Sequence, residues 1–253
     1  MESPGEGADR PVRRCSSRPR RALTLGTTTL VLSAALAGTA YGGTVTSGSV
    51  LTSTKAAIAQ QTGVHVVFRA NSGASATTEK IIADVGVTTG AETVSEGQSH
   101  LAVRVMPGYG YVSGDSSGLT TIFGLTSAEA KKVGSDWVSW KAGTSQYANL
   151  KADVTFAAVT ALLPRAKGTR LSTGITNGAN VYVLKWTVAA SSSTPMLSNT
   201  LTVSASGPSL PVEQISTASG GTKATTLLSG WGELVSASAP PAASTIASPK
   251  ITH

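Results

Sequence analysis

One stretch of the chain says most about its architecture: Val181-Tyr-Val-Leu-Lys-Trp-Thr-Val188. Successive side chains of an extended strand point to opposite faces, so the even-numbered residues of 182–188, all apolar, share one face. The other face begins with Val181 and Val183 and continues with Lys185. A strand with one face in water alternates cleanly between apolar and polar residues. This strand is apolar on both faces at its start, which predicts a sheet that needs cover on both sides.

Other short strands flank a helical middle. The pattern predicts strands at 64–69, 79–87, 100–106, 109–112, 169–173, 181–188, 197–205, 211–217 and 223–235, with turns at 88–91 and 174–178. Strands spaced about ten residues apart and separated by polar turns are typical of an antiparallel sheet.

Helices are expected at 50–61, 127–134 and 145–163, and an extended piece at 137–140. The second helix is preceded by Thr126-Ser-Ala-Glu129, a capping-box pattern in which the Thr hydroxyl accepts a backbone N–H and the Glu reaches back. The third carries two apolar stripes at helical spacing, which indicates that it is covered on most sides. Pro164 ends it.

The order strands, helices, strands predicts an α+β fold, and no boundary is apparent inside 50–246, so this range is expected to be one domain. About three helices must cover a sheet with two apolar faces. One solution is a curved antiparallel sheet whose concave side is lined with apolar side chains and closed by the helices. That shape suits a hydrophobic ligand. An ordinary filled core is the alternative that the same pattern allows.

Composition excludes several classes of protein. Of 253 residues, 40% are apolar and 13% charged, and serine and threonine together account for 67. A disordered chain has low apolar content and high net charge, and a disulfide scaffold needs more than the single Cys15. No second long apolar run exists, which excludes a membrane protein with several spans.

The first 40 residues have the layout of a signal peptide. Six arginines precede an apolar segment at 22–37, and small residues suited to cleavage lie at its end, Ala35-Leu-Ala37, and directly after it, Gly38-Thr-Ala40. Residues 22–41 are alternatively an uncleaved anchor, since about 20 residues span a bilayer. Either way the rest is expected to be exported, to the cell envelope or outside the cell. Cys15 lies upstream of the apolar segment, so no lipobox exists, and Sec and twin-arginine export both remain open.

The flanks of the domain are expected to lack structure of their own. Residues 41–49 are rich in Gly, Ser and Thr and predict a flexible linker, and 247–253 predict a disordered tail. The leader contributes +3 of the formal net charge of +7. The remaining +4 is too dilute to indicate a nucleic-acid partner.

One motif suggests catalysis. Gly114-Asp-Ser-Ser-Gly118 fits the pattern around a serine nucleophile, with Ser116 as the candidate. Such a serine needs a histidine base held by a carboxylate, but His65 and His100 fall in predicted strands. A Gly/Ser turn after a strand explains the motif better, and we expect no enzyme. Three scattered histidines give no ligand spacing for a metal, and no cofactor is expected.

The order of several segments resembles a known family. Tyr109-Gly-Tyr-Val-Ser-Gly114, Phe123-Gly-Leu-Thr-Ser-Ala-Glu-Ala130 and Trp137-Val-Ser-Trp140 are similar to segments of the LppX/LprG-type actinobacterial envelope proteins, relatives of the LolA-like lipoprotein carriers. The segments 201–213 and 230–235 are also similar. The resemblance implies a half-open antiparallel barrel with helices across its mouth, a cavity for acyl chains or lipidated cargo, and no catalysis. Many relatives are lipoproteins, and this chain departs from them in lacking the lipobox cysteine.

The expected function is that of an exported, non-enzymatic carrier or binder of a lipid or acylated molecule, with membrane contact through the N-terminal segment if it is not cleaved. A structural or interaction module of the envelope, with the same fold and no transported ligand, is the alternative. The candidate ligand contacts come from strand alternation alone: Val66, Phe68, Val103, Val105, Tyr182, Leu184 and Trp186.

Overall fold

The strand that contains residues 181–188 is one of twelve that join a single sheet. The computed structural model describes residues 44–71, 78–191 and 195–248. Within them the strands are β1 (Gly63–Asn71), β2 (Thr78–Gly86), β3 (Gly90–Glu96), β4 (Ser99–Met106), β5 (Tyr109–Gly114), β6 (Trp137–Lys141), β7 (Arg170–Thr176), β8 (Ala179–Val188), β9 (Leu197–Ser204), β10 (Pro211–Ala218), β11 (Lys223–Ser229) and β12 (Thr245–Ala247).

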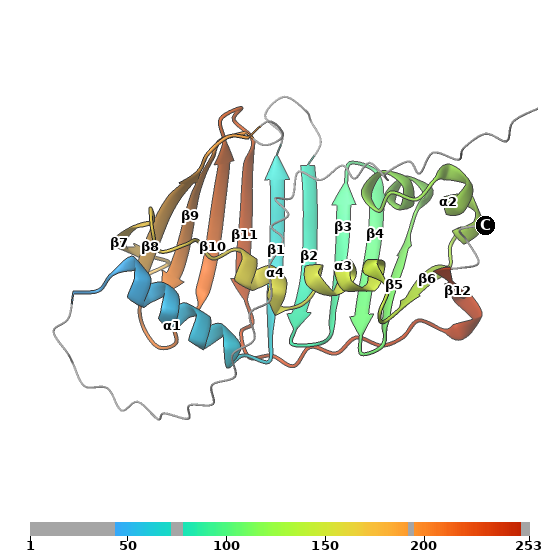
Figure 1. Ribbon diagram of the computed structural model, residues 1–253, viewed down its shortest axis with the longest axis horizontal. Helices are drawn as coiled ribbons and strands as arrows, with labels where there is room; N and C mark the ends of the chain where they lie inside the picture. The colour runs from blue at the N-terminus through green and yellow to red at the C-terminus, as the bar shows by residue number, and fades with distance from the viewer. Residues whose placement is uncertain (1–43, 72–77, 192–194, 249–253) are drawn as a thin grey trace, which may run out of the picture.

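The sheet is open at both ends. Its strand order is β12-β6-β5-β4-β3-β2-β1-β11-β10-β9-β8-β7, and neighbours are antiparallel except for the parallel pair of β12 with β6. Figure 1 shows it as one broad, twisted layer with β7 and β12 at opposite ends. The predicted α+β class, with an open antiparallel sheet and helices across one side, is confirmed.

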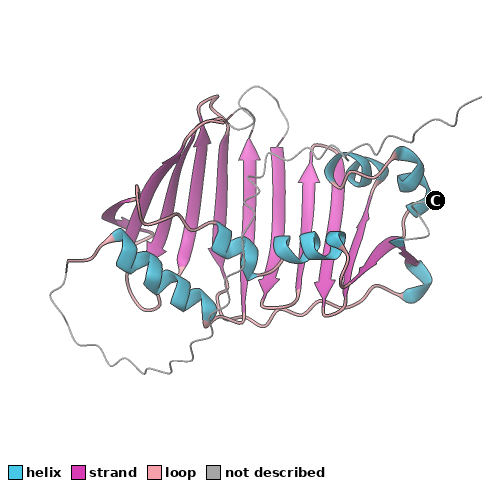
Figure 2. Cartoon of the chain, in the orientation of Figure 1, coloured by secondary structure: helices cyan, strands magenta, loops and turns pink. Residues whose placement is uncertain are grey.

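The helices lie on one side of this layer. They are α1 (Ser47–Ala59), the π-helix η1 (Gly118–Ile122), α2 (Ser127–Val133), α3 (Ser145–Asp153) and α4 (Phe156–Ala161). The short 3₁₀-helix η2 (Ala242–Ser244) directly precedes β12 at the end of the sheet. Figure 2 shows α1, α4 and α3 in a row across the strands, with α2 near one end of the sheet. We call the side under α1, α3 and α4 the helix face and the opposite side the outer face.

Two helix starts follow from capping chemistry. The predicted capping box of α2 is confirmed, because the Thr126 Oγ1 accepts from the Glu129 N–H at 3.2 Å and Glu129 Oε2 accepts from the Thr126 N–H at 2.7 Å. Thr46 and Ser49 form a second capping box, so α1 begins at Ser47, inside the segment that the sequence suggested as a linker. These bonds satisfy N–H groups that a helix end otherwise leaves unpaired.

The single helix expected at 145–163 is wrong, because the chain breaks between α3 and α4. At the break Thr155 forms a parallel bridge with Gly86, and its hydroxyl donates to the Lys151 carbonyl at 2.7 Å. A Cβ on Gly90 would lie 2.0 Å from the Val154 carbonyl oxygen. The break therefore presses the Val154 backbone against the sheet where Gly90 leaves room, beside the bridge of Thr155 to Gly86.

Two strand predictions also need correction. Residues 90–96 form β3, although a turn was expected to occupy 88–91 and no strand to follow it. β11 ends at Ser229 rather than at 235, because Gly230 and Gly232 adopt φ of 61° and 87° and turn the chain away. Both residues are glycines, which reach this left-handed region at little cost.

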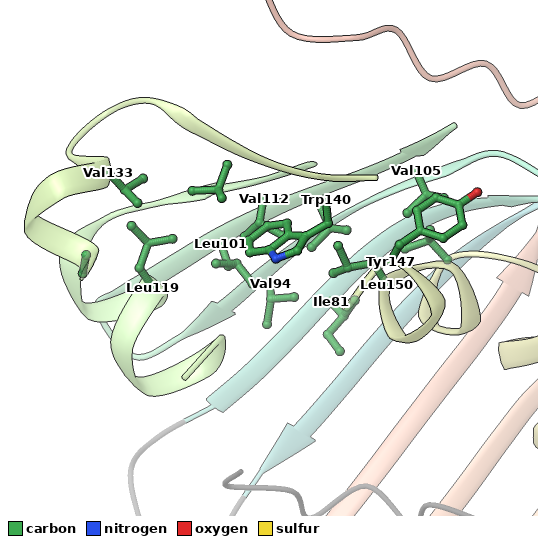
Figure 3. Packing of buried hydrophobic residues seen from close by; sticks show 14 residues of the cluster. Ile81, Val94, Leu101, Val105, Val112, Leu119, Val133, Trp140, Tyr147 and Leu150 are labelled. Atoms are coloured by element: carbon green, nitrogen blue, oxygen red, sulfur yellow. The ribbon is translucent and has the colours of Figure 1, made fainter. Parts of the chain in front are cut away.

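The core under the helices is divided into three clusters. Cluster 1 joins β2–β6 to η1, α2 and α3, and Figure 3 shows Tyr147 and Leu150 of α3 beside Val105 and Trp140. Cluster 2 joins Ile58 of α1 and Val159 of α4 to β1, β2 and β11. Cluster 3 joins α1 to β8 and β9. The apolar helix face thus extends along most of the sheet.

Candidate ligand-binding face

The seven predicted contact residues share the helix face but do not converge on one point. Val103, Val105 and Phe68 belong to cluster 1, Val66 to cluster 2, and Tyr182, Leu184 and Trp186 to cluster 3. Six strands separate β4 from β8, which at about 4.8 Å per strand places the extreme members roughly 34 Å apart. They mark one long face rather than one compact pocket.

Burial divides the seven into two kinds. Val103, Val105 and Leu184 are exposed by only 2%, 0% and 0%, so they form the core. The other four remain half-buried: Val66, Phe68, Tyr182 and Trp186. These four leave apolar surface that a ligand on this face can reach, and their role in binding remains a prediction.

A polar band crosses the helix face at β9–β11, and strand alternation did not reveal it. The register aligns Thr226 with Gln214 and Ser216 with Asn199. Ser216 donates from its hydroxyl to Asn199 Oδ1 at 2.6 Å, and Asn199 Nδ2 donates to the Leu197 carbonyl at 3.4 Å. On β10 polar residues occupy both faces around Ile215, so the pattern alone does not say which of them face the helices.

One buried hydroxyl of α1 has no partner among the described residues. Thr54 of α1 is fully buried, and its Oγ1 has no hydrogen-bond partner in the described structure. Val50 and Leu51 of α1 pack in cluster 3 with β8 and β9, whereas Ile58 packs in cluster 2 with β1 and β11. Thr54 lies between them in sequence, so the helix carries it across β10.

The Gly114–Gly118 loop is held by structural bonds. Asp115 accepts from the Gly118 N–H at 2.6 Å and from the His100 backbone N–H at 2.8 Å, which fixes the start of η1. The rings of the two candidate bases bond elsewhere, His100 Nδ1 to Ser95 Oγ at 3.2 Å and His65 Nδ1 to Asp84 Oδ1 at 2.8 Å. Ser116 is exposed in this loop.

Other chemistry-bearing groups give no site in the part of the chain that the structure describes. No group of three or more His, Cys, Asp or Glu residues is placed there to hold a metal ion. Burial, and to a smaller extent the neighbouring Tyr109, raises the pKa of the Tyr111 hydroxyl above its ordinary value of 10.0.

Two shallow hollows are lined by described residues. One of about 250 Å³ lies at the ends of β3–β5, with Val94, Leu101 and Gly114 in its wall. The other, about 390 Å³, lies beside the β7–β8 turn and includes Ile175 and Tyr182. Both are open to solvent, and no helix residue lines either one.

Most of the predictions about export and membrane contact concern residues that the structure does not describe. The predicted leader at 1–40, with Cys15, and residues 249–253 of the predicted tail lie outside the described residues. Across 44–71, 78–191 and 195–248, no helix has the length and apolar character needed to cross a bilayer.

Comparison with known proteins gives a likeness of fold. No family model matches the sequence, and no curated protein matches it. The Mycobacterium tuberculosis lipoprotein LppX is similar with a TM-score of 0.47 and 15% identity, over 75% of this chain and 98% of LppX. LppX is of the type that the sequence resembles, and at this identity the likeness concerns the fold alone.

Two further solved structures are similar. MucB, in a complex with MucA(peri), has a TM-score of 0.35 and 14% identity, over 76% of this chain and 59% of MucB. A DUF1329 family protein from Desulfovibrio piger has a TM-score of 0.34 and 10% identity, over 77% of this chain and 96% of that protein. At these identities the likeness concerns the fold and does not extend to binding.

Proposed function

We propose that this protein is an exported, non-enzymatic carrier or binder of lipid acyl chains or lipidated cargo, held against the helix face. The observation that carries the proposal is the apolar character of that face along most of an open sheet, with Val66, Phe68, Tyr182 and Trp186 only half-buried. Apolar surface removed from water contributes roughly 25 cal/mol per Å², so an acyl chain laid along such a face gains free energy from each residue it covers.

Helix α1 is the element best suited to cover or uncover a ligand. It contributes Val50, Leu51 and Ile58 to two different clusters, and its buried Thr54 hydroxyl is unsatisfied. A buried polar group without a partner costs about 1–3 kcal/mol. A polar headgroup or ester that reached this hydroxyl would satisfy it, which supports an amphiphilic ligand over a pure hydrocarbon.

Export and the absence of catalysis complete the proposal. Export is supported by the arginine-rich leader with its apolar segment and small-residue sites. A non-enzymatic role is supported by the strand order, which places His65 of β1 four strands from β5 and the Ser116 loop. It is also supported by the bond of His100 Nδ1 to Ser95 rather than to Ser116.

The alternative is an interaction module of the envelope whose helix face is filled by its own side chains. Cluster 1 favours it locally, because its side chains are fully buried where β4–β6 meet η1, α2 and α3: Val105, Val112, Leu119, Val138 and Val154. The two proposals differ in whether the purified protein holds lipid.

The test is native mass spectrometry and lipid extraction of the full chain purified from envelope fractions. We expect bound lipid in the unaltered protein and at least about tenfold less in Val66→Glu, because a carboxylate on the helix face is costly to bury beside an acyl chain. Val67→Glu is the matched control, since Val67 is the half-buried neighbour that points to the outer face. If the protein holds no lipid and takes up no fluorescent fatty acyl probe, the carrier proposal fails and the interaction module is the function that stands.

A further inference from the structure

The outer face carries a row of basic side chains that aligns across the sheet. The strand register places Arg170 opposite Lys185 on β7 and β8. The row continues through Thr200, Ile215 and Thr225 of β9, β10 and β11. It then reaches Arg69 of β1 and Lys80 of β2. Lys223 lies two residues along β11 from Thr225, on the same face, and is therefore diagonal to Arg69 of β1.

All five cations of this basic row are exposed: Arg69, Lys80, Arg170, Lys185 and Lys223. None of them forms an ion pair with another described residue. The acids of the outer face lie in other rows, since Asp84 contacts His65 at 2.8 Å and Glu213 is aligned with Leu227. The row therefore presents positive charge to solvent.

Two of the pairs in this row are direct like-charge pairs, which stability alone does not favour. Arg69 and Lys80 are cross-strand partners, as are Arg170 and Lys185. Like charges directly opposite each other destabilise a sheet. Such pairs stand out in a chain in which only 13% of residues are charged, and they indicate that the charge serves an external partner.

We propose that the basic row docks the protein on an anionic lipid bilayer, with the lipid phosphates as the contacted groups. The row extends over seven strands, roughly 30 Å, without converging on one point. A small anion is bound by donors that converge on it, whereas each Lys or Arg near an anionic bilayer adds its attraction separately. Bilayer contact through this face leaves the helix face accessible, and it requires no carried ligand.

Lysine footprinting on the full chain tests where the bilayer touches. Vesicles of phosphatidylcholine with 30% phosphatidylglycerol are expected to slow acylation of Lys80, Lys185 and Lys223 several-fold. Acylation of Lys55 on α1 and Lys131 on α2 should not change, because these exposed lysines lie on the helix side. Vesicles of pure phosphatidylcholine should give no protection, and neither should inorganic phosphate without vesicles. Addition of 0.5 M NaCl to the anionic vesicles should remove the protection, because salt screens such contacts.

Two footprinting outcomes would overturn the proposal. Equal protection of Lys55 and Lys131 would mean that the outer face has no special role. Protection of the row by dissolved polyglutamate but not by the vesicles would point to an acidic polymer instead of a bilayer.

A charge-matched pair of variants measures the strength of the contact. The triple variant R69Q/K80Q/K223Q is expected to bind the anionic vesicles about 100-fold more weakly at low salt, from roughly fivefold per side chain. The control K55Q/K131Q/K151Q removes the same charge from α1, α2 and α3 on the helix side and should lose fivefold or less. Both variants retain the leader at 1–40, so its affinity for the vesicles contributes equally to the two measurements. Equal losses in the two variants would contradict the assignment.

Discussion

Thr54 is a buried residue of the helix face whose hydroxyl lacks a hydrogen-bond partner among the described residues. Its side chain is fully buried on α1, yet its hydroxyl has no partner in the described structure. A helical threonine commonly donates to the carbonyl four residues earlier, as Thr52 does to Gly48 at 3.0 Å. The sequence shows the threonine but not the missing bond, because that depends on the strands beneath α1.

We expect Thr54→Val to raise the free energy of unfolding of the ligand-free protein by about 1 kcal/mol, because it replaces an unsatisfied buried hydroxyl by a methyl group of similar shape. Urea denaturation measures the change. Thr52→Val on the exposed side of the same helix is the control and should shift it by less than about 0.5 kcal/mol. A loss of stability in Thr54→Val would mean that the hydroxyl is hydrogen-bonded after all.

At the level of helices and strands, the sequence predicts what depends on neighbouring residues. The start of α2 was predictable because Thr126 and Glu129 cap it locally. The break between α3 and α4 was not, because it depends on Gly86 and Gly90, which lie more than 60 residues earlier. β3 was missed because its helix-face residues include Glu92 beside Val94, which hides the apolar alternation.

The close approach at the helix break leads to a stability test. Gly90→Ala is expected to lower the free energy of unfolding by about 2–3 kcal/mol, because its Cβ would meet the Val154 carbonyl oxygen and force the backbone apart. Gly174→Ala in β7 is the matched control, since its nearest neighbour would lie at an ordinary 3.5 Å. Equal effects of the two substitutions in chemical denaturation would refute the proposed role of the contact.

The strand pair β1–β2 offers a test of the like-charge alignment itself. Lys80→Glu places a carboxylate opposite Arg69 and is expected to raise the free energy of unfolding by roughly 0.5 kcal/mol at 20 mM NaCl. Much of the gain should disappear at 0.5 M NaCl, where exposed charges are screened. The same charge reversal at Lys55, which lies on α1, is the control. A stability that falls in Lys80→Glu would mean that Lys80 has a stabilising partner.

For the whole molecule, the order of elements was enough to predict an antiparallel sheet with helices across one side. The cover on both sides that the two-faced strands predicted is wrong, because the described helices that pack on the strands all join clusters of the helix face. The candidate contacts were predicted less well. Alternation correctly placed all seven on one face, but only the tertiary structure separates buried Val105 and Leu184 from half-buried Phe68 and Trp186. The division of the core into three clusters depends on where each helix lies, and no local pattern encodes that.

Tryptophan quenching by a brominated fatty acid tests most directly whether an acyl chain lies on the helix face. Trp186 is half-buried on that face in cluster 3, whereas Trp137 lies elsewhere, with the Arg104 guanidinium 4.7 Å from its ring centroid. We expect quenching that is largely lost in Trp186→Phe and retained in Trp137→Phe. Quenching that is absent from the unaltered protein, or equal in the two variants, would contradict the proposed carrier.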